Sequence, residues 1–308
     1  MRTGSLLRGT LAVAASACAF GSISPLTIIA TDRGMALQGI QTWRYLTASL
    51  LLMAIARWDA RRQISSAATP PAVSIAPWYA PRVLFVAGSG QAMVATLALA
   101  ALQWLPAATA SFLFYTYPAW VTIITAVRGT ERLDVTRIVA LIMALAGIGA
   151  MVGAPTSTAL HPTGLLIILA AALVYALYIP VLDHLQRGRR PTEVAQAIAV
   201  GGFVLFLTWS VTTGTLFVIP DAVALGASVM QGVLSSVAFI GFLAGLTVLG
   251  PVRTAITSTV EPFWTTLLGI LLLGQPLGAG TLLGGIGIMT AVVLLQRRPT
   301  VDALSAKT

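Results

Sequence analysis

The sequence predicts an all-α membrane protein in which ten transmembrane helices form two inverted five-helix repeats around a central cavity. Hydrophobic residues make up 57% of the 308 residues and charged residues only 9%, whereas a soluble domain carries about 25% charged residues. Long apolar runs follow one another along the chain, and a block in the fourth run returns in the ninth. A chain surrounded by lipid needs no polar surface, so this composition argues against a soluble fold.

The net charge of +9 would suggest a nucleic-acid partner in a soluble protein. Here the arginines stand in short segments between apolar runs, where they set membrane topology, and we expect no nucleic acid. Cys18 is the only cysteine, which excludes a disulfide framework and a thiolate metal site. Arg2 and Arg8 precede an apolar stretch, as in a signal peptide. Further long apolar runs follow it, so we interpret this stretch as the first span.

A helix needs about 20 apolar residues to cross the hydrocarbon core. The boundaries between adjacent spans are weakest at Leu105–Pro106 and Gly250–Pro251, where hardly any polar residue separates two runs. Proline in the first turn supports a new helix at both places. The predicted spans are 7–30, 36–57, 79–103, 106–127, 134–153, 163–183, 193–214, 222–248, 251–273 and 278–296.

The distribution of basic residues predicts the orientation. Ten spans place both termini on one side of the membrane. If that side is the cytoplasm, all but two of the 18 Lys and Arg residues lie on it. The exceptions are Arg33, beside Asp32 in an outer loop, and Arg44, inside the second span. Because cytoplasmic loops are enriched in Lys and Arg, we expect a multi-pass protein of the bacterial inner (plasma) membrane with both termini cytoplasmic.

Two sequence blocks indicate an internal repeat. Residues 117–120 (YPAW) match 261–264 (EPFW) at an offset of 144, and residues 20–25 match 175–180 at an offset of 155. The difference falls in the longer loop 59–77 of the first half. The predicted organisation is a first repeat at 7–153, an external linker at 154–162, a second repeat at 163–298 and a cytoplasmic tail at 299–308.

Each half holds five spans, an odd number, so the second half is inverted relative to the first. Inverted repeats are typical of secondary transporters, which hold substrate near the midplane where the repeats meet. Rocking of one half against the other exposes such a site to each side in turn. The prolines of the repeated blocks are the hinge candidates Pro25, Pro118, Pro180 and Pro262.

Several motifs resemble a known family. They are the block Phe20-Gly21-Ser22, the block Trp43-Arg44-Tyr45, the spans with Pro118 and Pro262, the turn 129–133 (GTERL) and the Gly-rich helix at 146–149. On these residues the chain resembles the drug/metabolite transporter superfamily, EamA-type branch, over roughly 10–298. The resemblance implies ten spans, cytoplasmic termini, a central cavity, no ATPase and usually export of amino acids or other metabolites. Within this family the chain resembles exporters of aromatic amino acids of the YddG type.

One departure from this family lies in the second repeat. Gly274-Gln275 stands where the family usually shows Gly-Glu. If that carboxylate caps or orients the last helix, an uncharged amide fills the role here, or nothing does.

Glu261 is the first candidate for substrate binding or coupling. It stands about ten residues into the ninth span, or about 15 Å deep. An ionisable side chain there is a functional candidate by default, and its repeat partner is Tyr117. We expect its protonation state to govern transport. The alternative is a protonated, structural Glu261 bonded to a carbonyl that Pro262 frees.

Arg44 is the other charge inside a span, about eight residues from its outer end. It could clamp a substrate carboxylate through two hydrogen bonds, pair with Glu261, or extend outward to the interface. The resemblance places an Arg here in many members regardless of substrate, which favours a structural or gating role.

Aromatic and uncharged polar side chains complete the candidate site. A cavity with aromatic walls and few charges suits a zwitterionic or weakly amphipathic solute. Helix–helix packing is the alternative for each residue, because small residues and hydroxyls also join helices in membranes. These candidates are Tyr115, Tyr117, Tyr175, Tyr178, Trp120, Trp264, Gln91, Gln231, Ser235 and Ser22.

These features together predict a monomeric secondary transporter, and by resemblance an exporter, that moves a small metabolite such as an amino acid by alternating access. An importer or permease of another small metabolite or drug-like solute is the alternative, and a channel is a third. An intramembrane enzyme is disfavoured because the sequence lacks paired intramembrane Asp, a Ser–His arrangement and a His-x-x-x-His pair. No phosphate-cradling Gly-Lys-Ser/Thr motif occurs, so we expect neither ATP nor another cofactor.

Overall fold

The computed structural model of the protein describes residues 2–66, 81–127, 135–153, 160–186 and 189–296. Every regular element in these ranges is a helix, as the sequence predicts. The elements are α1 (Arg2–Gly21), α2 (Ile23–Asp32), α3 (Leu37–Ser66), α4 (Pro81–Ala100), η1 (Ala101–Gln103), α5 (Ala107–Phe114), α6 (Tyr117–Val127), α7 (Val135–Gly153), α8 (Pro162–Gln186), α9 (Pro191–Thr212), α10 (Ala222–Ser258), α11 (Val260–Leu273) and α12 (Ala279–Gln296). The turn 129–133, most of the linker 154–162 and the tail 299–308 lie outside the described residues.

The helices have the length and composition of a multi-pass membrane protein. Six helical stretches of the described chain are long and apolar enough to cross a membrane, and three shorter apolar helices accompany them. The second predicted span, α3, is not among these because polar residues interrupt its apolar sequence. Its Gln41, Thr42 and Arg44 are nevertheless buried, since they face the neighbouring helices.

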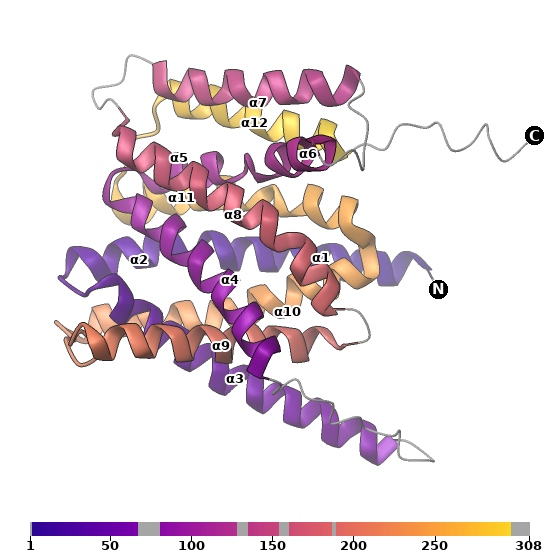
Figure 1. Cartoon of the computed structure of the whole chain (residues 1–308), viewed down its shortest axis with the longest axis vertical. Helices are drawn as coiled ribbons and strands as arrows, with labels where there is room; N and C mark the ends of the chain where they lie inside the picture. The colour runs from indigo at the N-terminus through magenta and orange to yellow at the C-terminus, as the bar shows by residue number, and fades with distance from the viewer. Residues whose placement is uncertain (1, 67–80, 128–134, 154–159, 187–188, 297–308) are drawn as a thin grey trace, which may run out of the picture.

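The two halves interlock helix by helix. α3 packs against α9 and α7 against α12, and the sequence offsets relate the two helices of each pair. α5, in the fourth predicted span, also packs against α11, in the related ninth span. The other large contacts also come in pairs that the repeat relates. The contact of α1 with α10 corresponds to that of α8 with α4, and the contact of α3 with α10 corresponds to that of α9 with α4. In Figure 1, α7 and α12 lie together at one edge and α3 at the opposite edge. The start of α1 and the end of α12 lie at the same end of the bundle, as an even number of spans requires.

Close approach between the helices depends on glycine. Helix association in lipid relies on van der Waals packing, because lipid tails are as apolar as the side chains. Gly88 of α4 and Gly201 of α9 meet backbone to backbone, and a Cβ at Gly201 would collide with the carbonyl of Leu84. The α4–α9 contact therefore tolerates no side chain at these positions.

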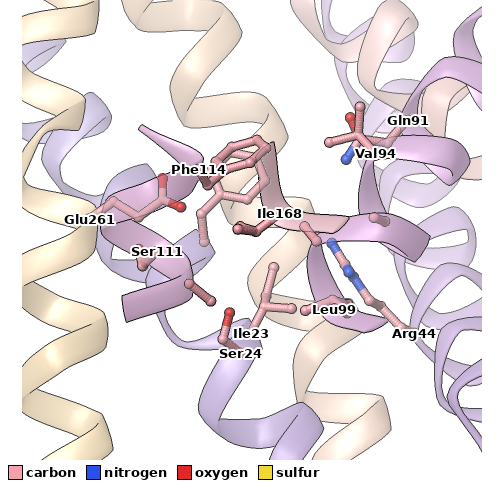
Figure 2. Close-up of a pocket in the computed structure, with 14 residues that line it drawn as sticks. Ile23, Ser24, Arg44, Gln91, Val94, Leu99, Ser111, Phe114, Ile168 and Glu261 are labelled. Carbon is pink, nitrogen blue, oxygen red and sulfur yellow. The ribbon is translucent and has the colours of Figure 1, made fainter. Parts of the chain in front are cut away.

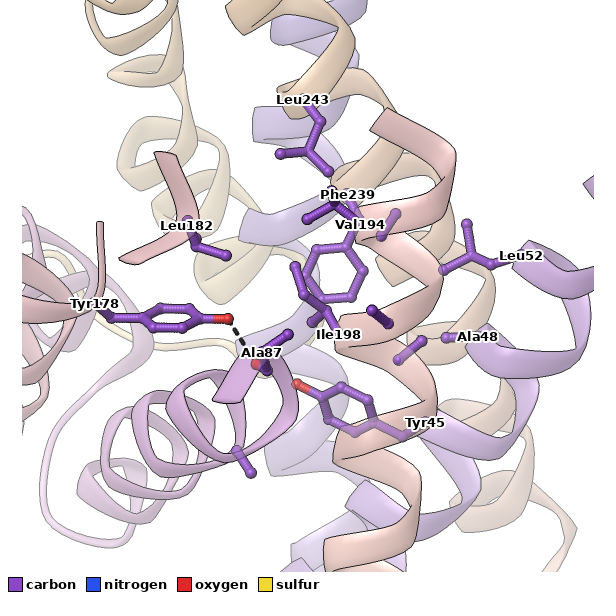
Figure 3. Packing of buried hydrophobic residues seen from close by; sticks show 14 of the residues in the cluster. Tyr45, Ala48, Leu52, Ala87, Tyr178, Leu182, Val194, Ile198, Phe239 and Leu243 are labelled. Carbon is purple, nitrogen blue, oxygen red and sulfur yellow. Dashed lines mark hydrogen bonds between the residues drawn. The ribbon is translucent and has the colours of Figure 1, made fainter. Parts of the chain in front are cut away.

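A cluster of buried side chains joins α3, α4, α8, α9 and α10 (Figure 3). Within it the rings of Tyr45 and Phe206 stack with centroids 5.3 Å apart. The Tyr178 hydroxyl donates a hydrogen bond of 2.6 Å to the carbonyl of Ala87, drawn as a dashed line in Figure 3. Because α4 and α8 come from different halves, this cluster ties the halves together.

An ion pair joins the end of α2 to the start of α10. The Arg33 guanidinium donates to Asp221 at 2.5 Å, and Asp221 also accepts the backbone N–H of Ala224 at 2.8 Å at the start of α10. Both contacts favour the charged carboxylate, so the Ala224 amide and Arg33 lower the pKa of Asp221.

One predicted helix boundary is wrong. α10 is helical from Ala222 to Ser258, past the helix end predicted at Gly250–Pro251. Its neighbours nonetheless show that the chain turns back within this stretch: Val248 and Leu249 lie against Gly9, whereas the backbone of Glu261 lies against Gly21, twelve residues along α1. Proline is compatible with the first turn of a helix, so Pro251 by itself does not mark a non-helical gap. At the other uncertain boundary, Pro106 stands immediately before α5, as predicted.

Candidate functional site

Three breaks interrupt the helices near the middle of the bundle, between α1 and α2, between α5 and α6, and between α10 and α11. A proline inside a helix lacks the N–H donor and clashes with the carbonyl four residues earlier. The helices end at Gly21, Phe114 and Ser258, which are the residues four positions before Pro25, Pro118 and Pro262. Three of the four hinge candidates thus coincide with real helix ends.

The fourth hinge candidate does not break its helix. Pro180 lies inside α8, which continues to Gln186. Since Pro180 is the repeat counterpart of Pro25, the two halves differ at this point.

Side chains from the other half take up backbone groups at the breaks. The Tyr115 hydroxyl donates to the freed carbonyl of Ser258 at 2.5 Å, and the Thr265 hydroxyl lies 3.0 Å from the freed carbonyl of Gly21. The Trp264 indole N–H donates to the Ser22 hydroxyl at 2.9 Å. The breaks are therefore satisfied by tertiary contacts, which a movement of the halves would have to exchange.

Glu261 lies in the first turn of α11, beside the break after α10. Its Oε2 is 3.0 Å from the hydroxyl oxygen of Tyr115. A tyrosine hydroxyl has one hydrogen, and a carbonyl can only accept. Tyr115 donates its hydrogen to the Ser258 carbonyl, which is the closer of its two partners. A hydrogen bond between Tyr115 and Glu261 then requires a protonated Glu261 that donates to the Tyr115 oxygen. The geometry thus favours a neutral Glu261, joined to the freed carbonyl through Tyr115 rather than directly.

Arg44 is buried inside the bundle, with only 3% of its surface exposed, so it does not extend outward to the interface. Its Nε donates to Ser235 at 2.7 Å and its Nη1 to Gln41 at 3.2 Å. The guanidinium carbon also lies 5.0 Å from the centre of the Tyr45 ring. No carboxylate of the described residues lies within ion-pairing distance, and a guanidinium carries five N–H donors. Arg44 is held in place with donors to spare.

A pocket of about 100 Å³ separates these two groups. Figure 2 shows Glu261 and Arg44 reaching it from opposite sides, with Ser24 and Ile23 between them and Ser111 on the side of Glu261. The pocket is built from both halves. Its lining residues are Phe20, Ile23, Ser24, Arg44, Gln91, Val94, Ala95, Ala98, Leu99, Ala110, Ser111, Phe114, Ile168 and Glu261.

Three of the sequence-predicted residues line this pocket, namely Glu261, Arg44 and Gln91. Two more act on them: Tyr115 contacts Glu261, and Ser235 holds Arg44. Sequence reasoning missed the hydroxyls of Ser24 and Ser111. Their signal was a hydroxyl in an apolar run that leads to a hinge proline, whereas the residues of the apolar wall have no sequence signal.

The predicted aromatic residues Tyr117 and Tyr175 lie behind the pocket. Their rings meet edge to face with centroids 4.8 Å apart, and both pack against Phe114, which does line the pocket. They support the wall and do not form its surface.

Five predicted residues lie elsewhere. Trp264 and Ser22 join α11 to the break after α1. Tyr178 belongs to the cluster of Figure 3. Gln231 is buried 3.2 Å from the hydroxyl of Thr27, and Trp120 lies on α6 outside the pocket lining.

The departure at Gln275 has a structural role that the sequence did not indicate. The Gln275 side-chain oxygen accepts the backbone N–H of Ala107 at 3.1 Å, so it serves the start of α5 and not the last helix. Gly274 ends α11 in the left-handed conformation, with φ of 60°, a helix end that favours glycine. A neutral amide acceptor is enough for this contact between the halves.

A model of the EamA-like transporter family matches residues 7–153 and 162–297. The chain belongs to this family. It is 28% identical over 194 residues to the uncharacterized inner membrane transporter YicL of Salmonella typhimurium (strain LT2). That match covers 62% of this chain and 64% of the relative, so the chain spans less than two thirds of the relative's length in this comparison. A solved crystal structure superposes on this chain with a TM-score of 0.60 at 20% sequence identity, and the alignment covers all of both chains. The two proteins therefore share a fold.

The family match and the apolar helices agree on a multi-pass membrane protein of the EamA-like transporter family.

Proposed function

We propose that this EamA-like protein is a secondary exporter of a small zwitterionic metabolite, such as an amino acid, that works by alternating access. The observation that supports this most directly is the central pocket, with a buried guanidinium on one wall and a carboxyl on the other. The unused donors of Arg44 match the two oxygens of a carboxylate, and Arg–carboxylate pairs are commonly bidentate.

The remainder of the pocket suits the other parts of such a solute. The hydroxyls of Ser24 and Ser111 can accept or donate hydrogen bonds, and Glu261 can accept a bond from an ammonium group once it has lost its proton. Leu99 and Ile168 offer apolar contact to a side chain. Sites for drug-sized ligands usually measure about 300–1,000 Å³, so the smaller pocket favours a compact metabolite over a drug-like solute.

The broken helices support alternating access. Transporters with inverted repeats commonly bind substrate at discontinuous helices near the midplane, where one half rocks against the other. Here the breaks at Ser22, Tyr115 and Thr259 lie close to the pocket and are bridged by contacts between the halves. Net export follows what the family usually does, and an importer or permease of another small solute is the second candidate.

Counterflow in proteoliposomes tests the proposal. Vesicles loaded with one unlabelled amino acid should accumulate the same labelled amino acid transiently and saturably. A channel gives no such overshoot, and a panel of amino acids without any response would contradict the proposal.

A matched pair of variants tests the pocket itself. Arg44→Gln should weaken apparent substrate affinity by about 30-fold or more, because losing one partner of a buried charge pair costs about 2–5 kcal/mol. Arg8→Gln removes a charge from the exposed start of α1 and should leave affinity unchanged. Equal affinity for Arg44→Gln and wild type, in protein of wild-type melting temperature, would rule out Arg44 as the carboxylate site.

A further inference from the structure

A second hollow lies between α4 and α8, on the outside of the bundle and apart from the central pocket. It has a volume of about 450 Å³ and is lined by Arg82, Val83, Val86, Pro180, Val181, His184 and Leu185. Val86 and Val181 are exposed, so the hollow opens on the surface of the protein. We call it the α4–α8 groove.

The groove follows from how α4 and α8 are joined. The helices are held tightly at the Tyr178–Ala87 hydrogen bond (Figure 3), where Gly90 leaves room for the Tyr178 ring. One turn further along, the short side chains of Val83 and Val181 do not bridge the gap. The antiparallel helices therefore touch at Tyr178 and leave a furrow from Pro180 to Leu185.

Basic side chains stand at one end of this apolar furrow. Arg82 lies in the first turn of α4, and His184 lies in the last turn of α8. A third basic residue, Arg189, adjoins them through a 2.8 Å hydrogen bond to the carbonyl of Leu185. Within the described parts of the chain, no acidic side chain forms an ion pair with Arg82. The groove is thus apolar along its length and cationic at the end that the positive-inside pattern assigns to the cytoplasm.

We propose that the α4–α8 groove binds an anionic phospholipid, with one acyl chain in the furrow and the phosphate held by Arg82 and His184. In the hydrocarbon region an open apolar furrow faces lipid chains, and basic pockets between transmembrane helices on the cytoplasmic side recognise anionic head groups. Arginine forms charge-assisted hydrogen bonds to phosphate oxygens. Because α4 and α8 belong to different halves, a lipid bound here braces the two halves and makes transport sensitive to anionic lipid.

Lipid retention measured by native mass spectrometry tests this. The full-length protein is purified in detergent and mixed with equal amounts of phosphatidylglycerol and phosphatidylcholine. We expect preferential retention of one phosphatidylglycerol. One basic residue near a membrane surface contributes about fivefold in affinity for anionic lipid, so Arg82→Gln should lower phosphatidylglycerol retention about fivefold without changing phosphatidylcholine. Arg8→Gln, an equal loss of charge elsewhere, should change neither.

A second variant tests the furrow without altering charge. Val86→Phe should fill it and lower phosphatidylglycerol retention while Arg82 and His184 remain. Equal retention of the two lipids, an equal loss in Arg8→Gln, or full retention in Val86→Phe would each overturn the proposal. A lipid-independent dimer that Val86→Phe disrupts would show that a second copy of the chain covers the groove instead. The melting temperature of each variant verifies folding, and Arg82 is exposed.

Discussion

At the scale of single residues, two ionisable side chains inside the membrane-spanning part, Arg44 and Glu261, are central to the proposed function. Placing an Arg at the centre of a membrane helix costs about 2.5–3.5 kcal/mol on insertion scales. The structure offsets part of this for Arg44 through Ser235 and Gln41, and it gives Glu261 a hydrogen-bond partner in Tyr115. Both side chains also line the central pocket and can form further hydrogen bonds there. A purely structural role would not need these further bonds.

Glu261 is expected to govern transport through its protonation state. Burial disfavours a charged carboxyl, whereas water entering the pocket favours it, so its charge responds to the side on which the pocket opens. Glu261→Gln keeps the size and a donor for Tyr115 but cannot titrate. Uptake into proteoliposomes, with and without an imposed pH gradient, should depend on the gradient in wild type and lose that dependence in Glu261→Gln.

A purely structural Glu261 predicts a different result. A protonated Glu and a Gln make similar hydrogen bonds, so Glu261→Gln would then transport like wild type. Coupling through Glu261 would be contradicted if wild-type uptake did not depend on the pH gradient, or if Glu261→Gln kept the same dependence on the gradient as wild type.

The sequence predicted part of this site for a clear physical reason. Charges are rare in apolar runs because burying them is costly, so Glu261 and Arg44 could be found without a structure. Their partners could not, since Tyr115 and Ser235 meet them only through packing of distant helices. Tyr178 shows the opposite error: its aromatic and polar character suggested a ligand contact, but the hydroxyl is used within the core.

At the scale of elements, prolines and tertiary hydroxyls together determine where helices break. The sequence shows four equivalent prolines, yet only three end a helix. Carbonyls freed at Gly21 and Ser258 find hydroxyl donors on other helices, whereas α8 runs on past Pro180. Such donors lie far away in the sequence, so the pattern of breaks could not be predicted from the prolines alone.

The break before α11 is expected to be needed for movement but not for folding. Pro262→Ala restores an N–H that can bond the Ser258 carbonyl, which competes with Tyr115 and extends the helix through Glu261. A proline inside a helix is unfavourable by about 3 kcal/mol, so the melting temperature should stay or rise while the transport rate falls. Pro180→Ala, in the continuous α8, is the control and should transport at a rate closer to wild type. A Pro262→Ala protein with full transport activity would argue against a hinge there.

The α4–α9 contact gives a stability prediction. Gly201→Ala places a methyl group against the backbone of Leu84 and Gly88, so unfolding in detergent should become easier by about 1–3 kcal/mol, as for an overpacked core. The matched control is Gly226→Ala in α10, where a Cβ meets nothing within 4 Å. Since alanine is the better helix former, that variant should be unchanged or more stable by about 0.5–1 kcal/mol. Equal thermal shifts for the two variants would refute the close contact.

At the scale of the whole molecule, the two sequence offsets relate helices that meet between the halves. The related helices α3 and α9 are in contact, as are α7 and α12, and the family model also matches the chain in two parts. The repeat could be predicted from the sequence because matching blocks occur in the same order in both halves and because basic residues lie in the segments between spans. The prediction failed at α10, where one helical stretch contains the turn between two predicted spans.

The orientation of the whole molecule remains a prediction from the positive-inside pattern. A reporter active in the cytoplasm should be active when fused after Arg298, and a reporter active outside should respond when inserted within 154–162. The reverse result would place both termini outside and would remove the basis for a cytoplasmic α4–α8 groove.

Alternating access requires that the pocket between the halves can be reached from both sides of the membrane, and thiol labelling can measure this. In a Cys18→Ala background, Ser111→Cys places a single thiol on the pocket wall. A membrane-impermeant thiol reagent should label it from either face, in inside-out and right-side-out vesicles, and the transported metabolite should protect it in both. Labelling from one face only, or labelling that the metabolite never slows, would contradict an alternating-access carrier with its substrate site at this pocket.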